Sequence, residues 1–461
     1  MSDHFRPFET RMQAEGLPDI AIRTFRHYYR QLIAGESGLI PESRLRPVPE
    51  LPNAETLGLD LEARGSEVLN QTIVIKLNGG LGTGMGLEQA KSLLSIKNDL
   101  TFLDVIAGQS ARSGVPLVLM NSFATQADSL AALAAHDALP GSPVGPDFLQ
   151  HKVPKIDRET LGPASWPPAP HLSWCPPGHG DLFTALVSSG VLERLRAAGR
   201  RYAFVSNADN LGAVLDPIIL GYFAANAFPF LMEVADRTEA DKKGGHLAIR
   251  PDGQLTLREL AQCPLEDHAA FQAIDRYRYF NTNNLWIDLD ALSDVLAAQD
   301  GILRLPLIRN LKTVDPRDPT SPEVYQLETA MGSAIAIFSG AEALRVPRAR
   351  FAPVKTTGDL LAVRSDAYEL TDDGRIVPAP LARQVPVVSL DSKHYKLVDG
   401  LDSRFPGGPP SMFDCHHLEI VGDIRFDPGV TLRGTIRLEN KTDQQIQLPA
   451  GVYADVSRIW G

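Results

Sequence analysis

The chain has 461 residues, of which 44% are hydrophobic and 22% charged, the composition of a globular protein with room for two or three domains. Its formal net charge of -11 argues against a protein that coats nucleic acid or an anionic membrane, because binding either one needs a broad basic surface. Any anionic ligand must therefore be held by a local site.

Residues 1–60 are expected to form an N-terminal helical segment. Phe25, Tyr28, Tyr29 and Leu32 recur there at helical spacing. The proline-rich stretch 45–52 that follows is typical of a linker.

A glycine-rich segment comes next, between a predicted strand at 71–77 and a predicted helix that carries Lys91. It has five glycines from Gly79 to Gly86, and because glycine has no Cβ, backbone N–H groups can close on phosphate oxygens. The helix N-terminus and Lys91 would add positive potential. The segment lacks the registers of a Walker loop and of a dinucleotide fold, so it predicts another kind of phosphate cradle. The alternative is a turn that serves only chain reversal.

Short β-rich runs then alternate with helical segments. Helices are predicted at 101–114, 125–139 and 181–199, and strands at 115–122 and 201–210. This alternation predicts a parallel sheet covered by helices on both faces, with ligands collecting at the carboxyl ends of the strands.

One polar loop precedes the helix predicted at 181–199, and a second lies at the end of the strand predicted at 201–210. Gly178 and His179 stand just before the helix at 181–199 and could reach a ligand, although such a sequence is also typical of a turn with a helix cap. Asn207 and Asp209 end the strand at 201–210, where a carboxylate is well suited to hold magnesium against a triphosphate. An Asx turn is the alternative for the second loop.

Further polar residues lie in the second half of the chain. The segments 232–245 and 257–264 could supply backbone and polar contacts around a sugar, although Lys242 and Lys243 could equally belong to a solvated turn. Asn281, Asn283 and Asn284 could offer amides to sugar hydroxyls or form a buried structural network. Glu328 could accept from a sugar hydroxyl or be a surface helix carboxylate. Lys355 stands in a β-like, uncharged run, where burying an ammonium would be costly without an anion.

The last residues, 386–461, consist of short β runs separated by turns rich in Gly, Pro and Asp. Near-regular spacing of such runs predicts a small C-terminal β-helix-like domain.

The glycine-rich segment LNGGLGTGMGxxxxKS resembles the signature of the UDP-glucose pyrophosphorylase family of the eukaryotic type, and the other motifs follow in the family's order over nearly the whole chain. The departure is the segment 87–90, where eukaryotic members carry a lysine and a Gly-Pro pair and this chain has the acidic Glu88. The resemblance implies an α/β fold whose catalytic nucleotidyltransferase domain, at 61–385, is a Rossmann-like, GT-A-like mixed sheet.

The resemblance also implies the site residues. UTP would contact Leu77, Asn78, Gly79, Gly80, Lys91, Gln150, Gly178, Asn207, Ala208, Asp209 and Lys355. The sugar phosphate would contact Gly79, Gly80, His179, Asn207, Asn283 and Glu328. Lys355, Lys91 and Asp209 would be catalytic, with Asp209 the ligand of a Mg²⁺ cofactor.

The implied reaction joins UTP and glucose 1-phosphate into UDP-glucose and pyrophosphate. One alternative is the same chemistry on another sugar 1-phosphate. The loop begins LNGG, unlike the LAGGQGTRLG type of the N-acetylglucosamine enzymes, which counts against N-acetylglucosamine 1-phosphate. Galactose 1-phosphate stays open, because galactose and glucose differ in the contacts of one hydroxyl. Another alternative is a non-catalytic nucleotide-sugar binding protein, which the presence of Lys91, Asp209 and Lys355 disfavours.

The compartment is indicated by the cysteines and the termini. Cys175, Cys263 and Cys415 are far apart with no C-x-x-C spacing, which suggests neither a disulfide framework nor a zinc cluster. The N-terminus lacks the pattern of a secretory signal, and the longest apolar run, 217–232, is too short to cross a bilayer comfortably. We therefore expect a cytoplasmic protein without membrane or nucleic-acid partners, which could form a homo-oligomer through its C-terminal domain.

Overall fold

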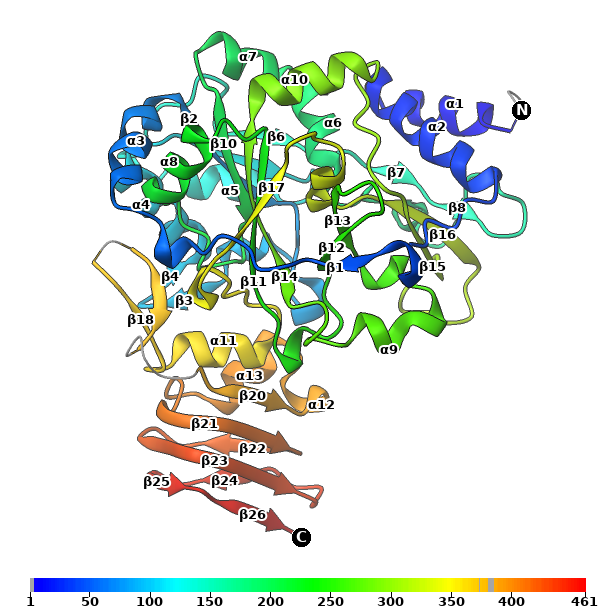
Figure 1. Ribbon diagram of the computed structural model, residues 1–461. Helices are drawn as coiled ribbons and strands as arrows, with labels where there is room; N and C mark the ends of the chain where they lie inside the picture. Colours follow the sequence, from blue (N-terminus) through cyan, green and yellow to red (C-terminus); the bar gives the residue numbers. More distant parts are fainter. Residues whose placement is uncertain (1–3, 373, 380–384) are drawn as a thin grey trace.

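The computed structural model describes residues 4–372, 374–379 and 385–461. Its centre is a ten-stranded sheet whose main path runs β1-β12-β14-β10-β2-β5-β6 (Figure 1). Its strands are β1 (Arg46–Pro47), β2 (Thr72–Asn78), β5 (Leu117–Asn121), β6 (Asp147–Leu149), β10 (Tyr202–Asn207), β11 (Phe230–Asp236), β12 (His246–Ile249), β13 (Leu255–Arg258), β14 (Tyr279–Asp288) and β17 (Glu342–Arg345).

The sheet is mixed. Strands β10, β2, β5 and β6 are parallel neighbours, whereas β14 runs antiparallel to β10 and to β11. The register pairs Asn207 with Leu77 and Asn78 with Asn121, so the carboxyl ends of three strands lie side by side. The prediction of a mixed α/β sheet is confirmed, and its parallel half is the part that the alternation of strands and helices predicted.

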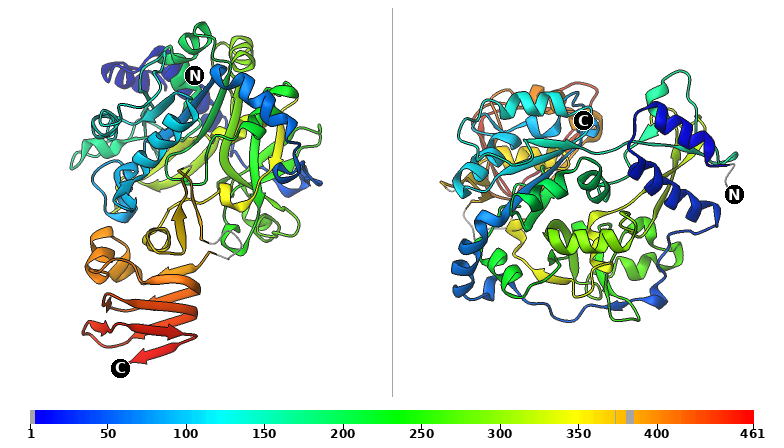
Figure 2. Two further views of the ribbon diagram at one scale, coloured as in Figure 1. Left: turned by 90° about the vertical axis from the view of Figure 1, so that its left-hand side faces the viewer. Right: turned by 90° about the horizontal axis from the view of Figure 1, so that it is seen from above.

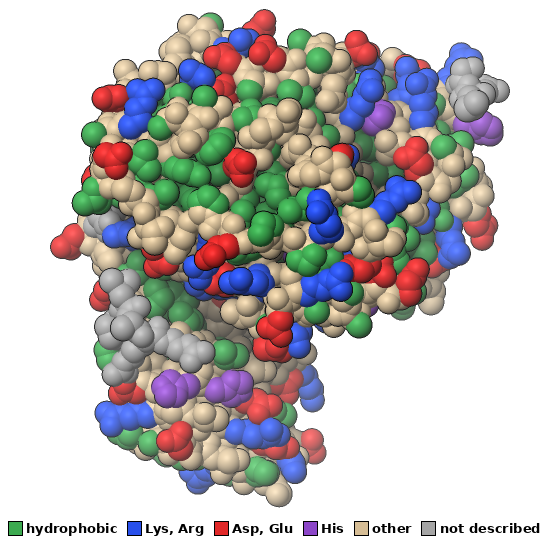
Figure 3. All heavy atoms as spheres, in the orientation of Figure 1, with side chains coloured by type: hydrophobic (Ala, Val, Ile, Leu, Met, Phe, Trp, Pro, Cys, Tyr) green, Lys and Arg blue, Asp and Glu red, His purple; other side chains and the backbone are tan. Residues whose placement is uncertain are grey.

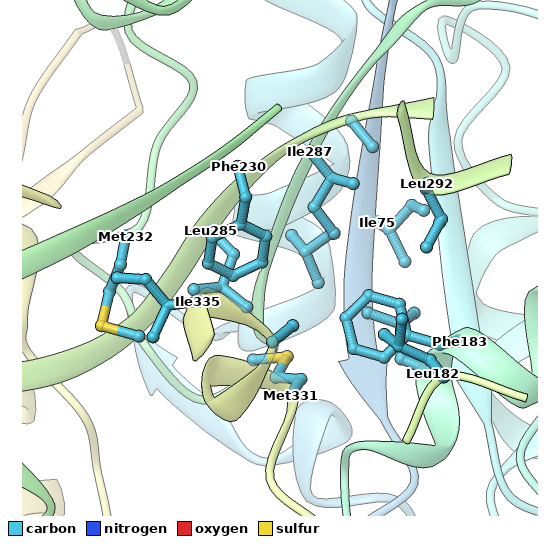
Figure 4. Packing of buried hydrophobic residues seen from close by; sticks show 14 of the residues in the cluster. Ile75, Leu182, Phe183, Phe230, Met232, Leu285, Ile287, Leu292, Met331 and Ile335 are labelled. Atoms are coloured by element: carbon cyan, nitrogen blue, oxygen red, sulfur yellow. The ribbon is translucent and has the colours of Figure 1, made fainter. Parts of the chain in front are cut away.

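Helices cover both faces of the sheet, as the alternation predicted (Figure 2). They are α3 (Asp60–Val68), α4 (Phe102–Ser113), α5 (Gln126–Leu133) and α8 (Pro217–Ala225), together with α6 (Asp181–Ser188), α7 (Val191–Ala197) and α10 (Leu289–Ala298). Figure 4 shows how Phe183 of α6 and Leu292 of α10 pack beside Ile75 and Ile287 of the sheet. The helix predicted at 181–199 is wrong in one respect, since Gly190 at φ 68° breaks it into α6 and α7.

The N-terminal segment forms helices α1 (Arg6–Ala14) and α2 (Asp19–Ile33), with Phe25, Tyr28, Tyr29 and Leu32 on the buried face of α2. That face packs against two small sheets (Figure 1). One is made of β15 (Ile308–Thr313), β16 (Glu323–Glu328) and β8 (Ile156–Asp157), and the other of β7 (Val153–Pro154) and β9 (Trp174–Cys175). The proline-rich stretch that we interpreted as a linker also supplies β1, which pairs antiparallel with β12.

The C-terminal residues form a stack of parallel strands below the main sheet (Figures 1 and 2). The order β20-β21-β23-β25 is parallel throughout, β26 also pairs with β23, and β22 pairs with β24 on a second face, which confirms the β-helix-like architecture. The strands are β20 (Val387–Leu390), β21 (Ser411–Val421), β22 (Ile424–Phe426), β23 (Val430–Asn440), β24 (Ile446–Leu448), β25 (Gly451–Ala454) and β26 (Ser457–Trp460). Residues 380–384, which directly precede the predicted domain boundary, lie outside the described residues.

Two helices of this region, α12 (Ser392–Tyr395) and α13 (Val398–Arg404), and helix α11 (Thr357–Arg364) share one apolar core with the strand stack. Acidic and basic side chains are interleaved on the face drawn in Figure 3. In the part of the chain that the structure describes, no helix has the length and apolar character needed to cross a bilayer.

Candidate active site

The glycine-rich segment leaves β2 as an irregular loop rather than as a turn into a helix. Gly82 and Gly86 have φ of 64° and 79°, and the backbone N–H of Lys91 donates to the carbonyl of Gly80 over 3.1 Å. Lys91 opens a single 3-10 turn, Lys91–Leu93. The prediction of a helix carrying Lys91 is therefore wrong. The left-handed glycines and the hydrogen bond from Lys91 to Gly80 hold this backbone in a loop conformation, which a helix cannot share. The N–H groups of the loop and the Lys91 ammonium could still bind phosphate.

A pocket of about 300 Å³ opens over this loop, at the carboxyl ends of the parallel strands. All the residues that the resemblance assigns to UTP line it, apart from Lys355. Its walls are Leu77, Asn78, Gly79, Gly80, Lys91, Ser92, Gln150, Pro176, Gly178, His179, Asn207, Ala208 and Asp209. We call it the nucleotide pocket.

Gln150 forms one wall of the nucleotide pocket directly against Gly79. Its backbone N–H donates to the carbonyl of Asn121 at the end of β5. A Cβ on Gly79 would lie 2.7 Å from the Gln150 amide group, so glycine is needed for this close approach.

The side chain of Asn78 is used by the fold. Its amide donates to the side-chain oxygens of Asn121 and Ser129, each over 2.8 Å, and the residue is buried. The side chain therefore ties β2 to β5 and α5, and Asn78 can meet a nucleotide only through its backbone.

A second pocket of about 340 Å³ adjoins the first and shares Gly178 and His179 with it. It brings together the remaining residues of the predicted sugar-phosphate site, Asn283 and Glu328, and also Lys355. Its walls are Gly178, His179, Gly244, Gly245, Glu259, Leu260, Ala261, Phe280, Asn281, Asn283, Ile308, Asn310, Glu328, Thr329, Ala330 and Lys355. We call it the sugar pocket.

The loop shared by the two pockets is held against the segment that follows β16. Thr329 donates to the carbonyl of Pro177 over 3.0 Å and accepts from Gly180 over 2.8 Å. Gly178 has φ 81°, and a Cβ there would lie 2.4 Å from the carbonyl oxygen of Thr329. Only glycine fits this position.

His179 is held as a neutral donor. Burial lowers its pKa to about 4, so the imidazole is uncharged near neutrality. Its Nδ1 accepts the backbone N–H of Met331 over 3.0 Å. The proton must then sit on Nε2, which leaves that N–H as the group free to donate to a phosphate oxygen.

Asn283 owes its position to a β-bulge. The register between β11 and β14 shifts between Glu233 and Val234, and Asn283 takes φ 59° there. A bulge of this kind turns a side chain out of the strand's alternation. The Asn283 amide oxygen then accepts from Asn281 over 2.9 Å at the wall of the sugar pocket.

Asn284 does not line the sugar pocket. It is buried, donates to Glu233 over 2.9 Å and accepts from Asn210 over 3.1 Å. The expectation that all three asparagines offer amides to a sugar is therefore wrong for Asn284, which belongs to the buried network that we weighed as the alternative. Asn281 and Asn283 line the pocket.

Glu328 ends strand β16 and lies 3.7 Å from the ammonium of Lys312, so it is not the helix carboxylate that we considered.

Lys355 is exposed and precedes α11, so the expectation of a buried ammonium is also wrong. The run around Lys355 is not a strand but a loop with one bridge, between Asn210 and Pro353. The Lys355 ammonium therefore needs no anion to compensate for burial.

That bridge joins the Asp209 loop to the Lys355 loop. The backbone of Val354 donates to the carbonyl of Asp209 over 3.2 Å, and Leu211 donates to Ala352 over 3.3 Å. Asp209 itself is ion-paired to Lys91 over 2.6 Å. The three residues assigned to catalysis thus lie on three segments. The Asp209 loop is hydrogen-bonded to the Lys355 loop through the backbone and to the glycine-rich segment through the Lys91 side chain.

Glu259 is a wall residue of the sugar pocket, and it lies in the segment 257–264 from which we expected contacts to a sugar without naming this residue. Burial raises the pKa of its carboxyl group, against an opposing effect of the Lys355 ammonium. A Cβ on Gly245 would lie 2.6 Å from this carboxylate, so the Gly-Gly pair at 244–245 makes room for it. The signal available in the sequence was that glycine pair, followed at some distance by an acidic residue at a strand end.

The described residues contain no group of three or more His, Cys, Asp and Glu side chains that could hold a metal. A divalent ion at Asp209 would have one protein carboxylate and would take its other oxygens from a bound triphosphate and water. Mg²⁺ is commonly held in that way, so the donor set fits it.

A mixed sheet whose parallel strands end at a glycine-rich phosphate loop, with a second polar pocket sharing a wall, defines a nucleotidyltransferase. The UTP--glucose-1-phosphate uridylyltransferase family matches residues 22–433, and the chain belongs to that family. The enzyme of this name from Solanum tuberosum is 40% identical over 425 residues, which are 90% of this chain and 84% of the relative. The one from Saccharomyces cerevisiae is 40% identical over 396 residues, 83% and 77% of the two chains.

Solved structures agree. A mutant of UDP-glucose pyrophosphorylase from Leishmania major in complex with UDP-glucose superposes with a TM-score of 0.91 at 43% identity, covering 100% of both chains. A structure described as UDP-glucose phosphorylase from Trypanosoma brucei gives a TM-score of 0.89 at 42% identity, covering 99% of this chain and 100% of that one.

Proposed function

We propose that this chain joins UTP and glucose 1-phosphate into UDP-glucose and pyrophosphate. The observation that carries the proposal is the pair of pockets that meet at Gly178 and His179. A nucleotide in one and a sugar phosphate in the other would bring their phosphates to the same loop. The names of the relatives support the same activity.

The reaction is an in-line displacement. An oxygen of the sugar phosphate attacks the α-phosphorus of UTP, and the bond to the β-phosphate oxygen breaks with release of pyrophosphate. A phosphate monoester has a second pKa of about 6 and is already ionised near neutrality, so the chain need not supply a general base. Catalysis then consists of alignment and of neutralising charge.

The residues divide these tasks. The backbone of Asn78, Gly79 and Gly80 aligns the phosphates, and the ammonium groups of Lys91 and Lys355 face them from two sides. His179 donates from Nε2 to the sugar phosphate without adding charge. Asn283 and Glu328 hold sugar hydroxyls in the second pocket.

Mg²⁺ would be held by Asp209 together with the triphosphate, and when bound it would offset charge on the phosphate oxygens. For Asp209 to serve it, the carboxylate must leave Lys91, which then turns to the triphosphate. The close pairing of the two side chains supports an exchange in which nucleotide and metal arrive together.

The test is pyrophosphate release with a panel of nucleoside triphosphates and sugar 1-phosphates, with the nucleotide sugar identified by mass spectrometry. We expect UTP with glucose 1-phosphate to give the highest kcat/KM. A higher value with galactose 1-phosphate would move the proposal to the other UDP-sugar. Binding of UDP-glucose without turnover of any pair would leave only a binding protein.

We also propose that the C-terminal stack mediates self-association. Its outermost strands, β25 and β26, expose Val452 (62% exposed) and Ile459 (53% exposed), and an open strand edge is a template for a second copy. Light scattering should show an oligomer that Ile459→Lys dissociates, and only monomer at micromolar concentration would reject this.

A cytoplasmic location is proposed from the cysteines. Cys175, Cys263 and Cys415 are buried free thiols, the state expected in a reducing compartment. Cell fractionation with a tagged chain tests it, and recovery in a membrane or secreted fraction would reject it.

A further inference from the structure

A fully buried lysine lies directly beneath the nucleotide pocket. Lys76 is on β2, immediately before the Leu77–Gly80 backbone, and only 2% of it is exposed. It lines neither pocket. No carboxylate among the described residues forms an ion pair with it, although lysine is seldom fully buried without a partner.

The strand alternation places Lys76 on an apolar face of the sheet. Val74 and Phe204 belong to the core on that side, and the Lys76 ammonium is 5.7 Å from the centre of the Phe204 ring. Burial at such a site costs free energy, and burial lowers the pKa of this ammonium to about 7. An apolar residue would suit the core better, so the polar head must serve a geometric purpose.

The two hydrogen bonds of Lys76 define that purpose. Its ammonium donates to the hydroxyl of Ser206 over 2.7 Å and to the carbonyl of Ala213 over 2.6 Å. Ser206 is its register partner on β10, which ends at Asn207, and Ala213 lies four residues beyond Asp209 in the connection to α8. We refer to residues 207–212, between these two partners of Lys76, as the loop 207–212. Lys76 therefore joins the two ends of the loop that carries Asp209.

A second buried cation continues the same arrangement. Arg350 donates to the carbonyl of Val214 over 2.9 Å and is itself paired with Glu233 over 2.7 Å. Successive carbonyls at the exit of the loop are thus held by Lys76 and by Arg350. Arg350 also lies in the segment that leads to Lys355.

We infer that Lys76 is a positioning residue of the transferase site: it clamps the loop 207–212 so that Asp209 faces the triphosphate and its metal. The inference deepens the proposed function and rests on it for the role of Asp209. The clamp itself can be tested without turnover.

Lys76→Met keeps the length of the side chain and removes its donors. We expect hydrogen exchange of the backbone amides at 207–213 to speed up by about 10-fold or more, while exchange in β2 and β5 stays unchanged. Binding of Mn²⁺ with α,β-methylene-UTP, followed by electron paramagnetic resonance, should weaken by about 10-fold, the scale of a residue that orients a metal ligand. The apparent KM for Mg²⁺ should rise and kcat should fall, with KM for glucose 1-phosphate little changed.

Lys155→Met is the matched control. Like Lys76, Lys155 is buried and lines neither pocket, but it donates to the backbone carbonyl of Val314 over 2.8 Å and not to residues beside Asp209. Ser206→Ala, which removes one end of the clamp, should change the same readouts in the same direction by less. Unchanged exchange at 207–213 in Lys76→Met overturns the inference, whether or not the wild type turns over. Equal losses in Lys76→Met and Lys155→Met also overturn it. Failure of the proposed function would show instead as a wild type that releases no pyrophosphate.

Discussion

The ammonium of Lys91 lies 2.6 Å from the carboxylate of Asp209, with both side chains mostly buried. One of the two residues is assigned to the triphosphate and the other to the metal, so each compensates the charge of the other. Under the proposed function, binding of the nucleotide together with its metal would replace one ion pair by two sets of opposite charges. Such an exchange would let an acidic protein keep a cation and a carboxylate beside each other in a pocket that we propose for anions.

Asp209→Asn tests the metal side of that exchange. The amide keeps the shape of the side chain but loses its charge, so kcat at saturating Mg²⁺ should fall by about 10²–10³. Lys91 loses its partner and becomes free to bind the triphosphate, so KM for UTP should not rise. Initial rates against Mg²⁺ and UTP measure both. Asp290→Asn, which removes a surface carboxylate paired with Arg196, should leave both constants unchanged.

Lys355→Ala tests the second cation. Lys355 is exposed and makes no ion pair among the described residues, so its removal should leave the unfolding temperature within a degree or two. Turnover should fall by about 10² or more, because the proposed function places this positive charge against the triphosphate. Pyrophosphate release and thermal unfolding give the two numbers. A near-normal rate would reject the catalytic role, and Lys393→Ala, at an exposed lysine of α12, is the control.

The sequence predicted the fold best where information is local. The runs that became β2, α4, β5 and β10 show their periodicity within a few residues, and the parallel half of the sheet follows from their alternation. The pairing of β1 with β12, and the insertion of β14 between β10 and β11, join segments far apart in the chain. Such pairings depend on packing of the whole molecule and have no local signal.

The candidate site divides in the same way. Residues at the ends of parallel strands could be predicted to meet, because those ends share one edge of the sheet. The conformation of the loop at 80–91 could not be predicted, since its path depends on the hydrogen bond from Lys91 to Gly80 and on glycines in left-handed conformation. Asn284 was expected at the sugar pocket but is buried, whereas Asn283 lines it, because strand alternation and the bulge between β11 and β14 decide which polar side chain faces the pocket.

Gly79→Ala tests the close approach of the glycine loop to Gln150. The new methyl group would meet the end of a flexible side chain at 2.7 Å, so the Gln150 amide should swing away while the fold persists. KM for UTP should rise by about 10-fold, the loss of roughly one good hydrogen bond. Gly84→Ala, in the same loop with open space around its Cβ, is the control.

Gln150→Ala supplies the second half of that experiment. If Gly79→Ala acts through Gln150, the two changes together should cost no more than the larger of the two alone. Additive losses in KM would show that Gly79 meets the nucleotide independently of Gln150.

The last prediction concerns pH and His179. Burial lowers the pKa of His179 to about 4 from an ordinary value of 6.5, so between these values the unfolded chain binds a proton that the folded chain does not. The contribution of His179 to stability is therefore complete above about pH 6.5 and is lost as the pH falls towards 4, by at most about 1.4 kcal/mol per pH unit.

His246, whose pKa burial also lowers, to about 3, contributes a slope of the same sign. The His179 term is therefore the difference between the wild type and His179→Gln in urea unfolding from pH 4 to 8. We expect the wild type to lose more stability than His179→Gln over that range, and ¹⁵N NMR to show the Nε2–H tautomer from pH 5 to 8. An imidazolium signal at pH 6 would contradict the neutral-donor assignment, because a charged ring could not accept the N–H of Met331 at Nδ1.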